Sequence, residues 1–461
     1  MLKPYDPHST SPKSLPLTFF DLIWLRIPPV QRLFFYEFPT LDHPNTNTTA
    51  FFHSLILPRL KHSLSLTLQH FLPLAGNLTW PESSHKPVVV YAEGDAVSLT
   101  VAESDADFNL LSGSEDIFQA TEYHPLLPNL AMSHDRAAAL ALQVTLFPNS
   151  GFSIGMVTHH AILDGKTGYL FLKSWALTYR SCSSSAESSS ASLPPELKPF
   201  YDRSVVKYPA RLDSIYAKHW LDQGGPNNRS LMCWEGKPAS SDLVRGTFQL
   251  TRSNIEKLRK TVINNQTSKE ERQHPLPHIS TFSLTYAYTL VCLLEAEGII
   301  GNTKDNDKAI LMAFAADFRP RLDPPLPPTY FGSCVVGKLV ALETKELVGK
   351  GFGLDMAVKI IGEAIKNLTI DGAEDSLSRF SAIPNASRFY STAGSPRFEV
   401  YNIDYGWGKL RKMDVVSIDT NRAISFSDTR NGDGVEIGLV LKKRHMEAFA
   451  SLFSQGLVDD Y

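Results

Sequence analysis

A serine-rich run near the middle of the chain, SCSSSAESSSASLPP at 181–195, most constrains how this protein can fold. Such a run holds too few large apolar side chains to order itself by burial, and it is typical of a flexible linker. The polar stretch DQGGPNN follows at 222–228. We therefore expect a long crossover over 181–228 that joins two domains of similar size, 1–180 and 229–461.

Composition agrees with two globular domains. Of the 461 residues, 43% are apolar and 20% are charged, which is enough apolar material for two cores. The net charge of −3 implies no broad basic field, so we expect neither nucleic acid nor an acidic membrane as a partner. The apolar stretch near the N-terminus is broken by Asp21, Arg26 and Pro28 and is too short to span a bilayer. We expect a cytoplasmic protein.

The cysteines carry little information about chemistry. They lie far apart and form no CxxC pair, so the sequence predicts neither a metal site nor a disulfide framework. We expect reduced thiols, as in a cytosolic protein.

Hydrophobic periodicity predicts strands and helices in the first half. A helix is expected over 49–71, and a helix is expected to begin just after Asp164. The expected strands are 88–91 and the pair 140–148 and 151–160, which flank a PNSG turn.

The second half has the same mixed character. A strand leads into a helix capped by Thr251 or Ser253, and a long apolar helix is capped by Ser280 or Thr281. The turn sequence NGDG at 431–434 predicts a hairpin, and 301–308 is expected to be a surface loop. The class is therefore α/β or α+β.

The stretch THHAILDG at 158–165 carries the clearest chemistry. An apolar strand delivers His160 to its end, where an Asp-Gly turn follows. A neutral imidazole can take a proton from an alcohol near neutral pH. No serine or cysteine stands in a GxSxG setting, which favours direct attack by a bound substrate. The HxxxD spacing alone is weak, because a strand-end histidine is more often structural.

Two further stretches are uninformative alone. DYGWG at 404–408 places glycines around an aromatic residue, which permits close backbone approach, but taken alone the stretch is better explained as a strand end with a buried tryptophan. YFGSC at 330–334 indicates a loop followed by a strand.

Taken together, these stretches resemble a known family. HHAILDG and DYGWG match the HxxxDG and DFGWG signatures of the plant BAHD acyltransferases in order and separation. The segments LTFFDLIWLRIPPVQRLFFYEFP, YFGSC and GVEIGLVLKK look like the subgroup that acylates anthocyanins and other phenolic glucosides, commonly with malonyl-CoA. The resemblance implies a chloramphenicol acetyltransferase-like fold, with two similar mixed-sheet domains and a solvent channel between them.

The resemblance also implies roles for residues of the first motif. His160 is expected in the channel as the general base. We count Asp164 with it as a candidate catalytic residue, although the resemblance implies that Asp164 turns away from the substrate and pairs with Arg319, a structural residue. Gly165 is expected to be structural, and Ser280 and Thr281 are expected to bind CoA near the start of the long helix.

The second motif carries a mixed expectation. Gly406, Trp407 and Gly408 are implied to be structural. Asp404 is implied to be structural in the main but is sometimes credited with a catalytic part, and we count it among the candidate catalytic residues.

A malonyl donor would need a cation near the acyl pocket. Lys166, two residues beyond Asp164, is the first candidate for that substrate-binding role, and a solvated lysine is the alternative. Arg397 is the second candidate and discriminates less between donors.

The sequence departs from the family pattern in three places. Tyr405 stands where phenylalanine is usual, and Ser333 where asparagine is usual. About Ser395, some members carry a tryptophan that donates to the oxyanion, so the oxyanion stabiliser is open here.

We expect an acyl-CoA-dependent O-acyltransferase that moves malonyl from malonyl-CoA to a sugar hydroxyl of a flavonoid or other phenolic glucoside. We expect no bound cofactor, no metal and a monomer. The alternatives are a BAHD transferase with another donor, acetyl-CoA or hydroxycinnamoyl-CoA, and a non-catalytic member that binds a ligand. A CoA-release assay separates the last from the others.

Overall fold

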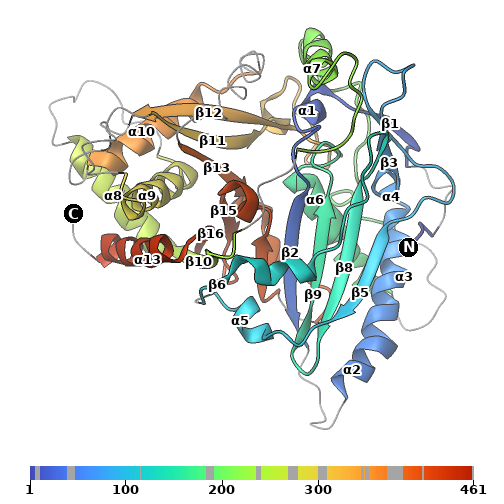
Figure 1. Ribbon diagram of the computed structural model, residues 1–461, viewed down its shortest axis with the longest axis horizontal. Coiled ribbons are helices and arrows are strands. Elements are labelled where there is room, and N and C mark those ends of the chain that lie inside the picture. Colours follow the sequence, from blue (N-terminus) through green and yellow to red (C-terminus); the bar gives the residue numbers. More distant parts are fainter. Residues whose placement is uncertain are drawn as a thin grey trace.

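The computed structural model describes residues 1–5, 11–38, 47–114, 116–182, 192–234, 240–267, 279–299, 309–343, 347, 352–370, 388–407 and 410–458. The expected loop at 301–308 and residues 183–191 of the serine-rich run lie outside this part of the chain. The described residues form two halves, each built on a mixed sheet with helices against it (Figure 1). The α/β prediction with two mixed-sheet domains is confirmed.

The N-terminal half holds a five-stranded sheet in the order β14-β2-β9-β8-β5. Its strands are β2 (Val30–Glu37), β5 (Ser98–Glu103), β8 (Leu140–Phe147), β9 (Gly151–Thr158) and β14 (Lys412–Val415). Every residue of β8 and β9 is buried, because both faces of these central strands are covered. The helices α3 (Leu57–Leu68) and α6 (Gly165–Ser181) pack on each other in this half.

A smaller sheet adjoins this core in the order β1-β4-β3-β7. Its strands are β1 (Ser14–Pro16), β3 (Asn77–Thr79), β4 (Val88–Val90) and β7 (Arg136–Ala138). The short elements of the chain are α1 (Phe19–Leu22), α4 (Leu72–Ala75), α5 (Phe108–Ser112), α12 (Ile418–Asn421) and the 3-10 turns η2 (Ala120–Leu126), η3 (Arg319–Arg321), η6 (Pro396–Phe398) and η7 (Val400–Asn402).

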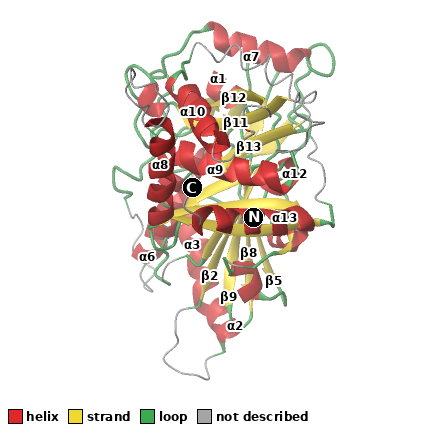
Figure 2. Ribbon diagram, turned by 90° about the vertical axis from the view of Figure 1, so that its left-hand side faces the viewer, coloured by secondary structure: helices red, strands yellow, loops and turns green. Residues whose placement is uncertain are grey.

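The C-terminal half holds a seven-stranded sheet in the order β12-β11-β13-β15-β16-β10-β6. Its strands are β6 (Phe118–Gln119), β10 (Leu243–Thr251), β11 (Ala309–Asp317), β12 (Val335–Glu343), β13 (Arg388–Gly394), β15 (Ile424–Asp428) and β16 (Gly434–Lys442). Its helices, α8 (Arg252–Thr267), α9 (Thr281–Ala296), α10 (Phe352–Lys366) and α13 (Lys443–Val458), gather on the face turned away from the N-terminal half (Figures 1 and 2). Thr251 caps α8 and Ser280 caps α9, as two of the predicted alternatives had it.

Each half lends a strand to the other. The strand β6 comes from the first half but pairs with β10 in the seven-stranded sheet. The strand β14 comes from the second half but pairs with β2 in the five-stranded sheet. The expected domain boundary at 181–228 does not predict either exchange. Backbone pairing of β6 with β10 and of β14 with β2 joins the two halves.

The helix expected over 49–71 is interrupted. The chain forms α2 (Thr48–Phe51), then a π-helical turn over Phe52–Ile56, then α3. Pro58 lies in the first turn of α3 and has no N–H for an i→i−4 hydrogen bond, so a wider turn precedes it.

The crossover is more ordered than its composition suggests. It contains α7 (Arg211–Asp222), a helix that the sequence analysis did not predict. The Trp220 indole donates to the Leu22 carbonyl at 2.7 Å, and Arg26 donates to the carbonyls of Ser230 and Asn228. The end of the crossover is therefore fixed against the N-terminal segment.

Candidate active site

His160 lies in a turn between the end of β9 and the start of α6. The strand ends at Thr158, so His160 stands two residues beyond it, and its side chain is partly buried. No other residue in the described part of the chain gives its Nδ1 a hydrogen-bond partner. The turn therefore presents the ring without tying it to a neighbouring side chain.

The next residues of the motif are built into the helix start. Asp164 is the N-cap of α6, and its Oδ1 accepts from the Thr167 N–H at 2.9 Å. Arg319 donates to both carboxylate oxygens, at 2.8 and 3.1 Å, and the Cys334 N–H donates at 3.0 Å. The predicted ion pair is present. Arg319 and the backbone N–H groups bond both oxygens of the Asp164 carboxylate, so Asp164 is not placed to pass a proton to or from His160.

Arg319 joins the two halves at this turn. It follows β11 of the C-terminal half, is 1% exposed, and also donates to the carbonyls of Tyr330 and Gly332 at 3.2 and 3.0 Å. Burial raises the pKa of Asp164, but the charge and hydrogen bonds of Arg319, with two backbone N–H groups, outweigh it and hold that pKa below its usual value. The pair is thus charged and fixes the turn that carries His160.

Two residues that the motifs do not contain position His160. The Trp24 ring is stacked on the His160 ring, with centroids 4.3 Å apart and planes 7° from parallel. Ser333, one of the departures from the family pattern, donates its hydroxyl to the His160 carbonyl at 3.2 Å. Sequence reasoning missed Trp24; the only signal was an aromatic residue in the quoted FFDLIWL segment.

The surroundings keep the His160 ring neutral. The pKa of His160 is lowered to about 4, chiefly by burial; a hydrogen bond with its own backbone opposes this, and the positive charge of Arg32 adds a smaller lowering effect. A neutral imidazole at physiological pH is the form that accepts a proton.

The two residues proposed for the malonyl carboxylate differ in their partners. Lys166 already has a carboxylate partner, because its Nζ lies 3.1 Å from Asp317 Oδ2, and its side chain is 36% exposed. Arg397 lies exposed in η6, where its backbone N–H donates to the Ser395 hydroxyl at 3.2 Å. The Ser395 oxygen, the position discussed for the oxyanion, therefore caps a turn.

Gly165 and the two CoA candidates occupy helix starts. A Cβ at Gly165 would lie 2.8 Å from the Phe398 ring, so only glycine lets η6 pack on the first turn of α6. Ser280 is the N-cap of α9 in the C-terminal half and Thr281 is its first residue; Ser280 is partly exposed and Thr281 is exposed. An exposed helix start with hydroxyl groups suits an anionic ligand.

The structure does not bring Asp404 to His160. Its carboxylate lies 3.6 Å from Arg180 and accepts from the Gly406 N–H at 2.6 Å. Arg180 stands at the C-terminal end of α6, whereas His160 precedes the N-terminal end, and the helix between them is roughly 22 Å long. This geometry gives no support to a direct catalytic part for Asp404, which stays a prediction.

The other residues of that motif pack in the N-terminal core. Tyr405 and Trp407 are stacked 4.8 Å apart, and the Trp407 indole donates to the Tyr179 hydroxyl at 3.1 Å. Gly406 has φ of +95°, a conformation that disfavours other residues. These observations agree with structural roles, and Gly408 lies outside the described residues.

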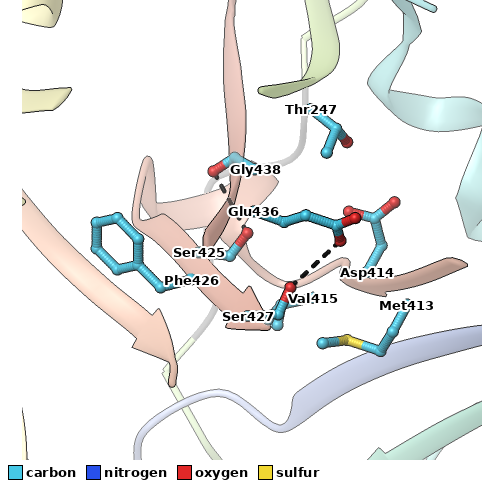
Figure 3. A pocket seen from close by; sticks show the side chains of 9 residues that line it. All are labelled: Thr247, Met413, Asp414, Val415, Ser425, Phe426, Ser427, Glu436 and Gly438. Atoms are coloured by element: carbon cyan, nitrogen blue, oxygen red, sulfur yellow. Dashed lines mark hydrogen bonds between the residues drawn. The ribbon is translucent and has the colours of Figure 1, made fainter. Parts of the chain in front are cut away.

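A small cavity opens at a different place, where β14 meets β15 and β16 (Figure 3). It is lined by Thr247, Met413, Asp414, Val415, Ser425, Phe426, Ser427, Glu436 and Gly438. Glu436 accepts from the Tyr401 hydroxyl at 2.6 Å, and burial raises its pKa to about 7. This cavity belongs to the strand exchange between the halves and holds none of the candidate site residues.

Some classes of site receive no support. In the part of the chain that the structure describes, no group of three or more His, Cys, Asp or Glu is placed to hold a metal ion. None of the described helices has the length and apolar character needed to cross a membrane.

Comparisons with known proteins identify the family of this chain. The model of the Transferase family matches residues 1–455. The chain is 42% identical to phenolic glucoside malonyltransferase 2 of Arabidopsis thaliana, over 98% of this chain and 95% of that protein. It is 41% identical to the Arabidopsis malonyl-CoA:anthocyanidin 5-O-glucoside-6''-O-malonyltransferase, over 98% of this chain and 96% of that protein.

The fold has solved counterparts. The crystal structure of vinorine synthase superposes with a TM-score of 0.68 at 19% identity, covering 98% of this chain and 96% of that one. The F. sporotrichioides TRI101, solved with coenzyme A and T-2, gives 0.61 at 14% identity, covering 95% and 97%. Fold and site together define the class as an acyltransferase of two mixed-sheet domains. The chain belongs to the Transferase family, the family of the plant BAHD acyltransferases.

Proposed function

We propose that this protein transfers malonyl from malonyl-CoA to a sugar hydroxyl of a phenolic or flavonoid glucoside, with His160 as the general base. The observation that carries the proposal is the His160 ring itself. It is neutral, stacked on Trp24 and free of any side-chain relay, because Asp164 is held by Arg319. The relatives named for malonyl transfer support the choice of donor and acceptor.

The reaction then needs one base and no covalent enzyme intermediate. His160 takes the proton of the sugar hydroxyl as its oxygen attacks the thioester carbonyl carbon, and a tetrahedral oxyanion forms. When the carbon–sulfur bond breaks, the protonated His160 returns the proton to the leaving CoA thiolate. General-base catalysis of this kind is worth about 10²–10⁴-fold.

CoA is a co-substrate in this scheme, and no cofactor stays bound. Ser280 and Thr281 are proposed to contact the donor, since hydroxyls and unbonded N–H groups at the start of α9 suit phosphate or pantetheine oxygens. We further propose a monomer that works in the cytosol. The four free cysteines fit a reducing compartment.

A second candidate within the family is another donor. The Arabidopsis agmatine coumaroyltransferase is 36% identical over 96% of this chain, and its name states a different acyl group and acceptor. The test is a screen of malonyl-, acetyl- and coumaroyl-CoA against phenolic glucosides and amines, read by mass spectrometry. Malonylated glucoside as the main product supports the proposal. Preference for coumaroyl-CoA overturns the donor, and absence of CoA release with every pair favours a non-catalytic protein.

A further inference from the structure

The buried guanidinium of Arg32 lies beside the first turn of α6, and Arg32 belongs to neither the HHAILDG nor the DYGWG motif. Arg32 stands on β2 and is only 6% exposed. Among the described residues no carboxylate lies within ion-pair distance of Arg32, and its Nε has no hydrogen-bond partner. A buried charge without a counter-ion is costly, so this position favours the binding of an anion.

Glycines leave the guanidinium open to the helix start. A Cβ at Gly165 would lie 3.7 Å from Nη2 of Arg32, and a Cβ at Gly168 would lie 3.9 Å from Nη1. The start of α6, which the Asp164 carboxylate caps, therefore faces a second, buried cation, and an anion bound beside Arg32 would be stabilised by the guanidinium and by the helix dipole. The Tyr169 ring, 5.4 Å from the Arg32 Cζ, offers a cation–π contact, and its hydroxyl offers a hydrogen bond to the guanidinium. The phenol brings no negative charge, because burial raises its pKa.

This place is within reach of the chemistry. The charge of Arg32 acts to lower the pKa of His160. Gly165, beside the guanidinium, follows His160 by five residues in the sequence. In a malonyl thioester the free carboxylate is separated from the reacting carbonyl by a single methylene. Its counter-ion must therefore lie close to the catalytic base, and Arg32 meets this condition.

We propose that Arg32 binds the free carboxylate of the donor's malonyl group, together with backbone N–H groups at the start of α6. The inference rests on the proposed function and names the residue that gives it donor selectivity. Lys166, paired with Asp317, and the exposed Arg397 are weaker choices. A charge shielded from water distinguishes a carboxylate from a methyl group more strongly than a solvated charge does.

The test compares two donors in one enzyme. Efficiency with malonyl-CoA and with acetyl-CoA is measured for the wild type, Arg32→Gln and Arg32→Lys, with a phenolic glucoside as acceptor. A charge-assisted contact is worth about 1.5–3 kcal/mol, so Arg32→Gln lowers the malonyl-to-acetyl ratio by about 10- to 150-fold. Arg32→Lys keeps the positive charge and gives a malonyl-to-acetyl ratio between those of Arg32→Gln and the wild type. Lys166→Gln and Arg397→Gln serve as matched controls and lower it much less.

The malonyl-to-acetyl ratio distinguishes binding of the malonyl carboxylate from other effects of Arg32. Loss of its charge also raises the pKa of His160, but that change acts on both donors and cancels. Equal losses with both donors, or a larger change in the ratio with Lys166→Gln, overturn the proposal.

A binding measurement separates failure of the inference from failure of the function. Calorimetry in the His160→Ala background measures malonyl-CoA and acetyl-CoA affinity without turnover. Weaker malonyl-CoA binding on adding Arg32→Gln supports the site even if the wild type malonylates no glucoside. Unchanged malonyl-CoA binding overturns it even if the wild type is a malonyltransferase.

Discussion

The rings of Trp24 and His160 are stacked 4.3 Å apart and nearly parallel, although the two residues lie far apart in the chain. The indole N–H of Trp24 donates to the Val335 carbonyl at 3.4 Å, which ties the stack to the C-terminal half. The plane of the proposed base is therefore set by a contact that spans both halves of the protein.

Replacing Trp24 tests whether this stack positions the base. We expect Trp24→Leu to lower kcat by about 10- to 100-fold, because misplacement of a catalytic group by an ångström has effects of that order. Water reaching the ring also moves the pKa of His160 up from about 4 toward 6.5, so the acidic limb of kcat/KM shifts to higher pH. Trp24→Phe, which keeps an aromatic face, recovers most of the rate. An unchanged pH profile would mean that the stack is merely structural.

His160 and its neighbour provide a matched pair of substitutions. We expect His160→Ala to lose at least about 10²–10⁴-fold in kcat, the usual contribution of a general base. His159 is fully buried, and its Nδ1 accepts from the Ala161 N–H at 3.3 Å, so His159→Asn keeps the turnover of its folded fraction. Steady-state kinetics with both substrates varied should be sequential, and ping-pong behaviour would contradict direct transfer.

The buried Asp164–Arg319 ion pair should contribute more to stability than the partly exposed Asp317–Arg319 ion pair does. Asp164→Asn leaves the buried Arg319 guanidinium partly uncompensated, which costs about 3–5 kcal/mol in the free energy of unfolding. Asp317 also pairs with Arg319, at 3.0 Å, but it is 33% exposed, and Asp317→Asn should cost much less. Chemical denaturation of the three proteins measures both effects, and equal costs would refute this assignment.

We expect the buried hydroxyl of Tyr405 to destabilise the fold. Tyr405 is 1% exposed, and its hydroxyl has no hydrogen-bond partner among the residues that the structure describes, at a position where the family usually has phenylalanine. Tyr405→Phe should raise the free energy of unfolding by about 1–3 kcal/mol, the cost of an unsatisfied buried polar group. Tyr36→Phe is the control, because the Tyr36 hydroxyl donates to the Ile403 carbonyl at 3.3 Å and its loss should not stabilise. A Tyr405→Phe variant that is less stable than wild type would show that the hydroxyl is satisfied in solution.

The sequence predicted correctly those elements that depend on interactions between residues close together in the chain. Thr251 and Ser280 cap helices as predicted, because a capping hydroxyl needs only the N–H groups of the next turn. The helix over 49–71 was only partly correct, since the effect of Pro58 on the preceding turn was overlooked. The helix α7 was missed because its polar surroundings suggested a linker, and its order depends on packing against α1.

The candidate site divides in the same way. The sequence by itself determined the mixed α/β class, the strand–turn–helix around His160 and Asp164, and, through resemblance, the partnership of Asp164 with Arg319. Only the tertiary structure decided that Trp24 stacks on the base, that the charge of Arg32 acts on it, that Lys166 is already paired, and that Asp404 is a helix length away. The physical reason is range: periodicity and caps act within a few residues, whereas stacking, ion pairing and strand exchange depend on which distant segments the packed core brings together.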